Sequence, residues 1–207
     1  FTPDEIDSLL AAGSSTQRTG IRNTALILFL LDTGVRVAEC VQVRLDDVDW
    51  ANGRVRILHG KGRKQRSIPL WKTTVREVRD WLRLNMQLTS NSPLLPTRDG
   101  NVMTRANVTQ RLKLAVKAAT GVHPELAKMS VSPHKIRHAT AMSLLQSGAG
   151  TSEIALWLGH ESPSTTHMYV EADITMKERA LARLKPPDIK AARYRPPEAL
   201  LRFLQSL

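Results

Sequence analysis

Two histidines and one of the two tyrosines of the chain lie in the short segment LGHESPSTTHMYV, residues 158–170. Tyr169 follows His160 by nine residues, and the residues between them offer little apolar material to bury its ring. A tyrosine is a poor nucleophile at neutral pH because its pKa is about 10. Neighbouring cations lower that pKa, and a histidine can take the proton or hydrogen-bond a reacting phosphate. Tyr169 is therefore a candidate nucleophile, with a half-buried aromatic residue as the alternative interpretation.

A second group of candidate residues opens the segment SPHKIRHATAMSLLQSG, residues 132–148. Ser132 is a good helix N-cap, and Pro133 suits the first position of a helix. His134, Arg137 and His138 then fall in or beside the first turn, on one face. Cations at this positive end of the helix dipole are mildly unfavourable until an anion binds, and free backbone N–H groups help to hold a phosphate. Histidines hydrogen-bonded in the core, with the arginine paired to an acid, are an equally good interpretation.

Arg36 and Lys61 are two further cations at the ends of predicted elements. Arg36 follows the helix break in DTG and begins the next short helix, where an i,i+3 ion pair with Glu39 is the alternative. Lys61 lies in or beside the turn of the Gly-rich segment HGKGRKQR, where an ordinary surface lysine is the alternative. Spacing in the sequence does not show that these cations converge on the tyrosine.

The elements that must position these residues are mainly helical. Alternation of polar and apolar residues at 54–58, followed by SIPL at 67–70, predicts a β-hairpin around the Gly-rich turn. The expected fold class is mainly α with a small antiparallel β-sheet or hairpin, α+β. Apolar periodicity, capping residues and helix stops predict helices at about residues 3–12, 21–32, 36–41, 71–83, 104–119, 133–147, 151–158, 175–184 and 197–207.

The helix at 71–83 carries two stripes of the same period. Trp71, Val75, Val78 and Leu82 form an apolar stripe that we expect to pack. The second stripe is basic, and a solvated surface is the simpler interpretation of it, with DNA contact as the alternative. It consists of Lys72, Arg76, Arg79 and Arg83.

Composition favours a polyanionic partner. The 207 residues include 30 Lys+Arg against 19 Asp+Glu, for a net charge of +11. Such a balance is typical of nucleic-acid-binding proteins, although a basic structural protein without an active site has it too. The longest apolar run, residues 25–31, is too short to cross a bilayer, so we expect a soluble, cytoplasmic protein. Cys40 is the single cysteine and is expected to be a buried thiol.

Four motifs in this order, TGVRVAEC, GKGRKQRSIPL, SPHKIRHATAMSLL and LGHESPSTTHMYV, resemble the catalytic domain of tyrosine recombinases, the phage integrase family. The resemblance covers residues 1–184 and implies the fold of that catalytic domain. It also implies a DNA strand-transferase that cleaves and rejoins DNA through a 3′-phosphotyrosyl intermediate. Neither ATP nor a metal or other cofactor is implied. His134 and His138 have the i,i+4 spacing of a zinc pair, but they lack the intervening Glu and a convincing third ligand.

The resemblance also implies a role for each matching residue. Tyr169 would be the nucleophile, while Arg36 and Arg137 would hold the non-bridging phosphate oxygens. Lys61 would protonate the leaving 5′-oxygen, and two histidines would assist proton movement and hydrogen-bond the phosphate. These are His134 and His160. Glu39 would support Arg36, His138 would lie just behind the site, and the basic residues after Lys61 would contact DNA. These are Arg63, Lys64 and Arg66.

The domain organisation expected from the resemblance is a catalytic domain at 1–184 and a Pro-rich connector with a helical tail at 185–207. The family's N-terminal DNA-binding domain is expected to be missing from this chain. The expected partner is double-stranded DNA, bound by a homo-tetramer on paired sites, with no membrane contact. A C-terminal helix, at 175–184 or at the end of the chain, is expected to dock either in cis or on a neighbouring subunit. The expected location is the bacterial nucleoid or a phage-infected host.

Two other functions use the same residues. A type IB topoisomerase-like enzyme would form the same intermediate but rejoin the same strand after rotation. A catalytically silent DNA-binding module would keep the motifs without forming the intermediate. The DNA target is not encoded in a linear pattern, because groove and backbone contacts are scattered along the chain.

Overall fold

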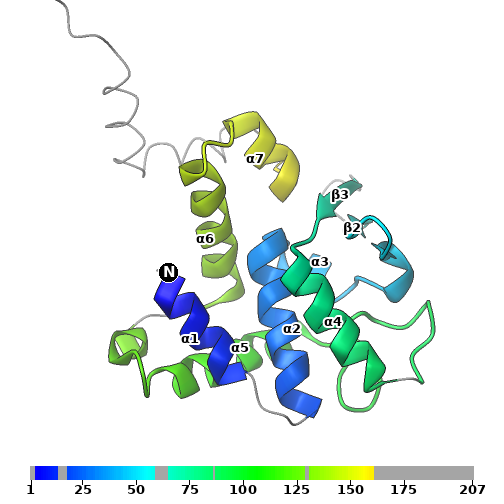
Figure 1. The fold of residues 1–207 in the computed structure, drawn as a ribbon, viewed down its shortest axis with the longest axis horizontal. Helices are drawn as coiled ribbons and strands as arrows, with labels where there is room; N and C mark the ends of the chain where they lie inside the picture. Colours follow the sequence, from blue (N-terminus) through cyan, green and yellow to red (C-terminus); the bar gives the residue numbers. More distant parts are fainter. Residues whose placement is uncertain (1–2, 14–17, 59–64, 86, 129–130, 161–207) are drawn as a thin grey trace, which may run out of the picture. The chain divides into compact units, whose positions relative to one another are not determined.

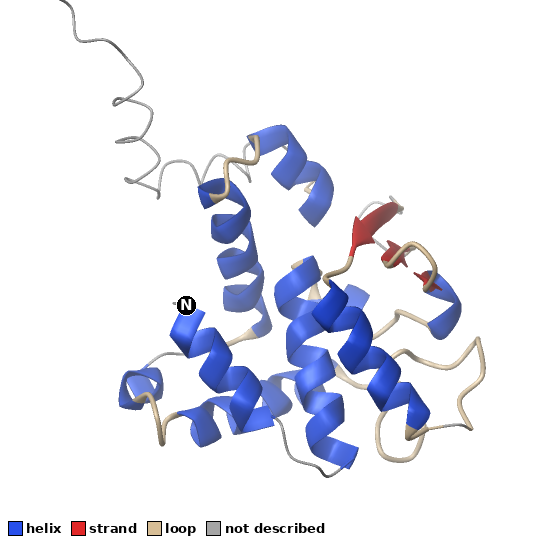
Figure 2. Cartoon of the chain, in the orientation of Figure 1, coloured by secondary structure: helices blue, strands red, loops and turns tan. Residues whose placement is uncertain are grey.

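The computed structural model describes residues 3–13, 18–58, 65–85, 87–128 and 131–160. Within them helices dominate and a three-stranded antiparallel sheet lies at one edge (Figures 1 and 2). The predicted fold class is thereby confirmed. None of the described helices is long and apolar enough to span a bilayer. The predicted helices at 175–184 and 197–207, and the predicted boundary at 184/185, lie outside the described residues.

The central element is helix α2 (Arg18–Thr33), which contains the apolar run at residues 25–31. Every side chain of that run is at most 7% exposed. A helix that is apolar on all sides must be covered on all sides. Helices α1 (Pro3–Gly13), α4 (Lys72–Arg83) and α6 (Pro133–Gln146) pack against it, and Figure 1 shows α2 between α4 and the other two.

The sheet consists of β1 (Val48–Asp49), β2 (Arg54–Ile57) and β3 (Arg66–Pro69), in that order. Val55 pairs with Ile68, and both are buried, while the arginines of β2 alternate outward. The predicted hairpin is present. Strand β1 was not predicted, because two residues are too few to show an alternating pattern, and neither was the 3-10 helix η1 (Leu45–Asp47) that precedes it.

The remaining helices begin and end at the expected signals. Thr104 and Ser132 cap α5 (Arg105–Ala119) and α6, and each side-chain oxygen accepts a backbone N–H three residues on. A short 3-10 helix, η3 (Pro124–Lys128), separates them. Helix α7 (Thr151–Leu158) ends at Gly159, whose φ of +67° is a left-handed conformation that glycine adopts most easily.

One packing prediction was wrong. Trp71 was expected to pack with the apolar stripe of α4, but it is 53% exposed. It lies at the N-cap position, before the first helical residue, and so outside the stripe. Trp81, at 3% exposure, packs beside Val78 in the core instead.

Candidate active site

Arg137 is a buried cation, only 5% exposed, in the first half of α6. Its Nη1 donates to the carbonyl oxygen of Gly34 at 2.6 Å, and its Nη2 donates to that of Leu158 at 2.8 Å. A buried guanidinium with carbonyl partners keeps its full positive charge, whereas one paired with a carboxylate would be neutralised. Both of these acceptors are backbone carbonyl oxygens, whereas the alternative interpretation expected a carboxylate.

Arg36 lies beside Arg137 because the chain turns sharply at the end of α2. Gly34 has a φ of +58° and follows the last residue of α2, so that Arg36 becomes the N-cap of the short helix α3 (Val37–Cys40). The Nη1 of Arg36 donates to the carbonyl oxygen of Gly159 and to Glu39 Oε1, both at 3.3 Å. The predicted Arg36–Glu39 pair is therefore present, and the arginine side chain remains 32% exposed.

Glu39 is shared between two arginines. Its side chain is 2% exposed and accepts bonds from the backbone and side chain of Arg36 and from Nη1 and Nη2 of Arg66, at 3.2 and 2.8 Å. Burial raises the pKa of Glu39, but the hydrogen bonds and charges of Arg66 and Arg36 outweigh it, so the pKa lies below its usual value. The carboxylate is therefore ionised at neutral pH.

The C-terminal end of α7 is the common anchor of these arginines. Gly159 N–H bonds to Leu156 O and His160 N–H bonds to Ala155 O, which is the Schellman pattern of helix termination. The next three carbonyl oxygens each accept from a different arginine. They are Trp157 O from Arg66 Nε at 2.9 Å, Leu158 O from Arg137 and Gly159 O from Arg36. Cations are favoured at this negative end of a helix dipole.

His160 follows this anchor directly. Burial, and then the charges of Arg137, Arg36 and Arg66, lower its pKa to about 4. Its imidazole is therefore neutral at pH 7 and can donate one hydrogen bond or accept one. Three arginines and one carboxylate leave a net charge of +2 around a neutral histidine. Such a group of residues is suited to bind a phosphate and to stabilise charge that develops on it.

Comparison with known proteins identifies the family. The sequence model that describes the phage integrase family matches residues 1–176. The chain belongs to the phage integrase family. The integrase/recombinase y4rC of Sinorhizobium fredii is 39% identical over 207 residues, covering 100% of this chain and 62% of that protein. The tyrosine recombinase XerC of Oceanobacillus iheyensis is 35% identical over 173 residues, covering 80% of this chain and 54% of that protein.

Solved structures agree with this assignment. The crystal structure of XerA recombinase has a TM-score of 0.75 and 27% identity, covering 90% of this chain and 64% of that chain. A post-cleavage complex of XerH with its palindromic difH substrate has a TM-score of 0.73 over 88% of this chain and 52% of that chain. At 24% identity, the XerH structure supports the fold alone. The chain spans about half to two thirds of the length of these relatives.

The two histidines of α6 that were predicted to belong to the site lie on the surface. His134 and His138 are both exposed. His134 is three residues before Arg137, which places the two side chains on neighbouring positions of the helix. Burial, and then the charge of His134, lower the pKa of His138. His138 lines a separate cavity of about 600 Å³ over α2, α6 and α7, so its predicted place behind Arg137 remains a prediction.

Among the described residues no three His, Cys, Asp or Glu side chains gather as a metal site.

Four predicted site residues lie outside the described residues. They are Lys61, Arg63, Lys64 and Tyr169. Arg66, the third residue predicted to contact DNA, is described, but its side chain is only 11% exposed and bonds to Glu39 and Trp157 O. Its predicted DNA contact therefore remains a prediction, while the structure gives it internal partners.

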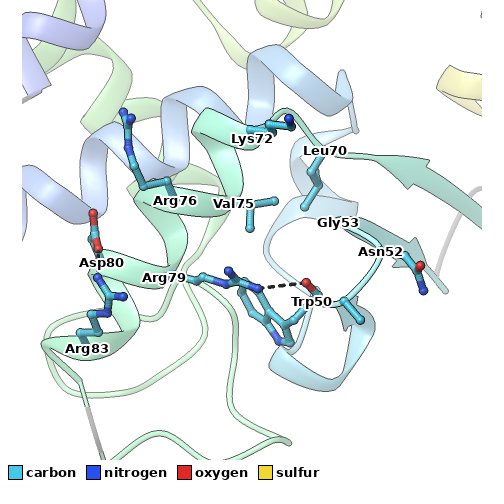
Figure 3. A pocket seen from close by; sticks show the side chains of 11 residues that line it. Trp50, Asn52, Gly53, Leu70, Lys72, Val75, Arg76, Arg79, Asp80 and Arg83 are labelled. Carbon is cyan, nitrogen blue, oxygen red and sulfur yellow. Dashed lines mark hydrogen bonds and ion pairs between the residues drawn. The ribbon is translucent and has the colours of Figure 1, made fainter.

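The basic stripe of α4 forms a different surface. A pocket of about 570 Å³ lies between α4 and the turn at residues 50–53 (Figure 3). Arg79 packs over the ring of Trp50, at 5.8 Å to its centroid, and donates to its carbonyl oxygen at 3.0 Å. Arg83 pairs with Asp80 on the same helix. These local partners favour the simpler interpretation, a solvated basic surface.

Sequence reasoning missed the role of Arg66 and of the carbonyl oxygens that end α7. The order of motifs indicated which segments meet, but a backbone oxygen leaves no mark in residue types. One usable signal was present. Gly159 directly follows an apolar helix, which is typical of a left-handed helix stop and of exposed terminal carbonyls.

Proposed function

We propose that this protein is a site-specific DNA recombinase that cleaves and rejoins double-stranded DNA through Tyr169. The observation that carries the proposal is the convergence of Arg36 and Arg137 on one helix end, next to the neutral His160. The relatives named tyrosine recombinases support it. We propose that the protein acts in the cytoplasm, on the DNA of the bacterial nucleoid or on the DNA of an infecting phage.

The proposed reaction conserves the energy of the DNA backbone. Tyr169 Oη attacks the scissile phosphorus, the bond from phosphorus to the 5′-oxygen breaks, and a 3′-phosphotyrosyl bond forms. Lys61 gives a proton to the leaving oxygen, and the proton of the phenol passes to a nearby base, with His134 as the candidate. Attack by the 5′-hydroxyl of another strand reverses these steps.

The arginines stabilise the charge of the transition state. The non-bridging oxygens gain negative charge as the phosphorus becomes five-coordinate, and two fixed guanidinium groups offset that charge. Because backbone carbonyls hold Nη1 of Arg36 and both Nη atoms of Arg137, these two side chains need little reorganisation when DNA binds. His160, neutral at pH 7, donates a hydrogen bond to one phosphate oxygen.

The proposed assembly is a homo-tetramer on two paired DNA sites. In it, the C-terminal helical tail, residues 197–207, docks on a second copy of the chain. The tail carries four leucines, and a segment of this length is not a stable helix by itself in water. The cavity over α2, α6 and α7 offers an apolar surface for the tail of a second copy. Its apolar lining includes Leu31, Met142, Leu144 and Trp157.

Covalent trapping tests the proposed reaction. A nicked DNA substrate loses a short fragment after cleavage, so the protein–DNA adduct accumulates and can be counted on a denaturing gel. Tyr169→Phe should abolish the adduct and leave DNA affinity unchanged. Tyr194→Phe, which alters the other tyrosine of the chain, is the matched control and should keep it.

Other outcomes point to the other functions. No adduct from the complete protein with its natural DNA site would indicate a silent DNA-binding module. Adduct with relaxation of supercoiled DNA, but without strand exchange between two sites, would indicate a topoisomerase-like activity. An adduct that persists in Tyr169→Phe would remove the proposed nucleophile.

A further inference from the structure

Arg66 connects three segments that the sequence keeps far apart. It lies on β3, and its three donor nitrogens have partners on two other elements: Nη1 and Nη2 bind Glu39 of α3, and Nε binds Trp157 O of α7. Two parallel bonds from one guanidinium to one carboxylate fix both groups in a single plane. With its side chain 11% exposed, Arg66 is an internal connector.

The partner of Arg66 is also the partner of Arg36. Each oxygen of Glu39 accepts one bond from Arg36 and one from Arg66. Without Arg66, the carboxylate would pair with Arg36 alone and neutralise it. With Arg66 present, the triad of two guanidinium groups and one carboxylate keeps a net charge of +1, so that Arg36 can still attract a phosphate.

The other end of Arg66 fixes the turn that carries His160. A Cβ atom added to Gly159 would lie 2.7 Å from Arg66 Nη1 and 3.0 Å from its Cζ. The guanidinium therefore packs directly on the glycine backbone, beside the carbonyl that accepts from Arg36. One side chain thus fixes both the helix stop before His160 and the carboxylate behind Arg36.

We propose that Arg66 is a positioning residue of the strand-cleavage reaction, which holds Arg36 and the His160 turn in place through Glu39 and the end of α7. The proposal rests on the function proposed above. Arg66 does not touch the phosphate in this assignment, and it acts through the geometry and charge of Arg36. A lysine at this position keeps the charge but cannot make the two-pronged bond to Glu39.

The test compares Arg66→Gln and Arg66→Lys with Arg56→Gln in the complete protein. Arg56 lies on the adjacent strand, is exposed and donates to Asp46 O, so its variant matches the loss of charge without touching Glu39. We expect both Arg66 variants to lower the single-turnover rate of adduct formation by about 100-fold at saturating DNA, as loss of one charge-stabilising donor does. DNA affinity should change by less than about three-fold, and Arg56→Gln should keep the rate.

A substrate with a methylphosphonate at the scissile position separates positioning from general damage. This group replaces one charged non-bridging oxygen by a methyl, so a misplaced Arg36 matters less. The rate deficit of Arg66→Gln should shrink at least about ten-fold on this substrate, whereas a poorly folded protein is slow on both. An equal deficit on both substrates, or a rate within about three-fold of Arg56→Gln, overturns the proposal.

A second measurement does not depend on DNA chemistry. The ring protons of His160 report its titration by NMR, and the charge of Arg66 contributes to its low pKa. Arg66→Gln should move this titration toward the ordinary range, and Arg56→Gln should not. If Tyr169 forms no adduct, the proposed function fails, but this measurement still decides the positioning role. An unmoved titration in Arg66→Gln refutes that role.

Discussion

At the scale of single residues, the central feature is a set of charges that are kept from cancelling one another. Arg137 is buried with carbonyl partners, and Glu39 divides one negative charge between Arg36 and Arg66. Buried charges are costly unless hydrogen-bonded, so this arrangement is maintained only by a precise set of partners. The result is a site whose net charge is positive before any substrate arrives.

His160 gives a pH prediction at this scale. Its pKa in the folded protein is about 4, below its ordinary value of 6.5, so between these values the unfolded chain binds more protons than the folded one. His160 should therefore contribute a fall in the free energy of unfolding as the pH is lowered from about 6.5 toward about 4. Urea unfolding across this range should show that His160→Gln flattens the fall. Equal slopes in the His160 variant and the unaltered protein would mean that His160 titrates in the folded state as it does in the unfolded chain.

At the scale of elements, a turn glycine at the end of α2 positions one side of the site. Gly34 has a φ of +58°, its carbonyl accepts from Arg137, and an added Cβ would lie 2.7 Å from Leu158 Cδ2 and 3.1 Å from Thr140 Cγ2. Gly34→Ala should therefore displace both α7 and the acceptor of Arg137, and so lower both the unfolding free energy and the rate of adduct formation.

Gly53 provides the matched comparison for Gly34. Its φ of +60° is nearly the same, but an added Cβ meets nothing closer than 3.9 Å. Both alanine variants carry the left-handed strain of about 1–2 kcal/mol, so the difference between them isolates the steric contact. Thermal unfolding should show the larger loss in Gly34→Ala by at least about 1 kcal/mol. Equal losses would contradict the proposed role of this turn.

The elements were largely predictable because their signals are local. Thr104 and Ser132 mark helix starts by their own side chains, and the apolar run of α2 marks a buried helix by composition. The position of Arg66 was not predictable in this way. Its partners are 27 and 91 residues away along the chain, and one of them is a backbone oxygen. Only the resemblance to a family indicated that the segments meet, and it did not distinguish a DNA contact from an internal connector.

At the scale of the whole molecule, the proposed tail docking makes assembly depend on one apolar cavity. Ending the chain after Leu184 should reduce the species on paired DNA sites from tetramers to smaller complexes, which light scattering after size separation can measure. Met142→Glu, which places a charge in the cavity, should have the same effect. The control variant is Gln110→Glu, which alters an outward residue of α5 and should leave tetramers intact. Tetramers that survive both changes would show that other surfaces hold the copies together.

The anchor at the end of α7 also affects how this domain can diverge in evolution. The oxygens that hold the three arginines belong to the backbone, so they stay in place whichever side chains the helix carries. Leu156, which is 76% exposed, can be replaced without moving an acceptor, whereas a side chain at Gly159 would be strained by the φ of +67° and would displace the Arg66 guanidinium. Substitutions on the outer surface of α7 can therefore change that surface while the acceptors of the three arginines stay in place.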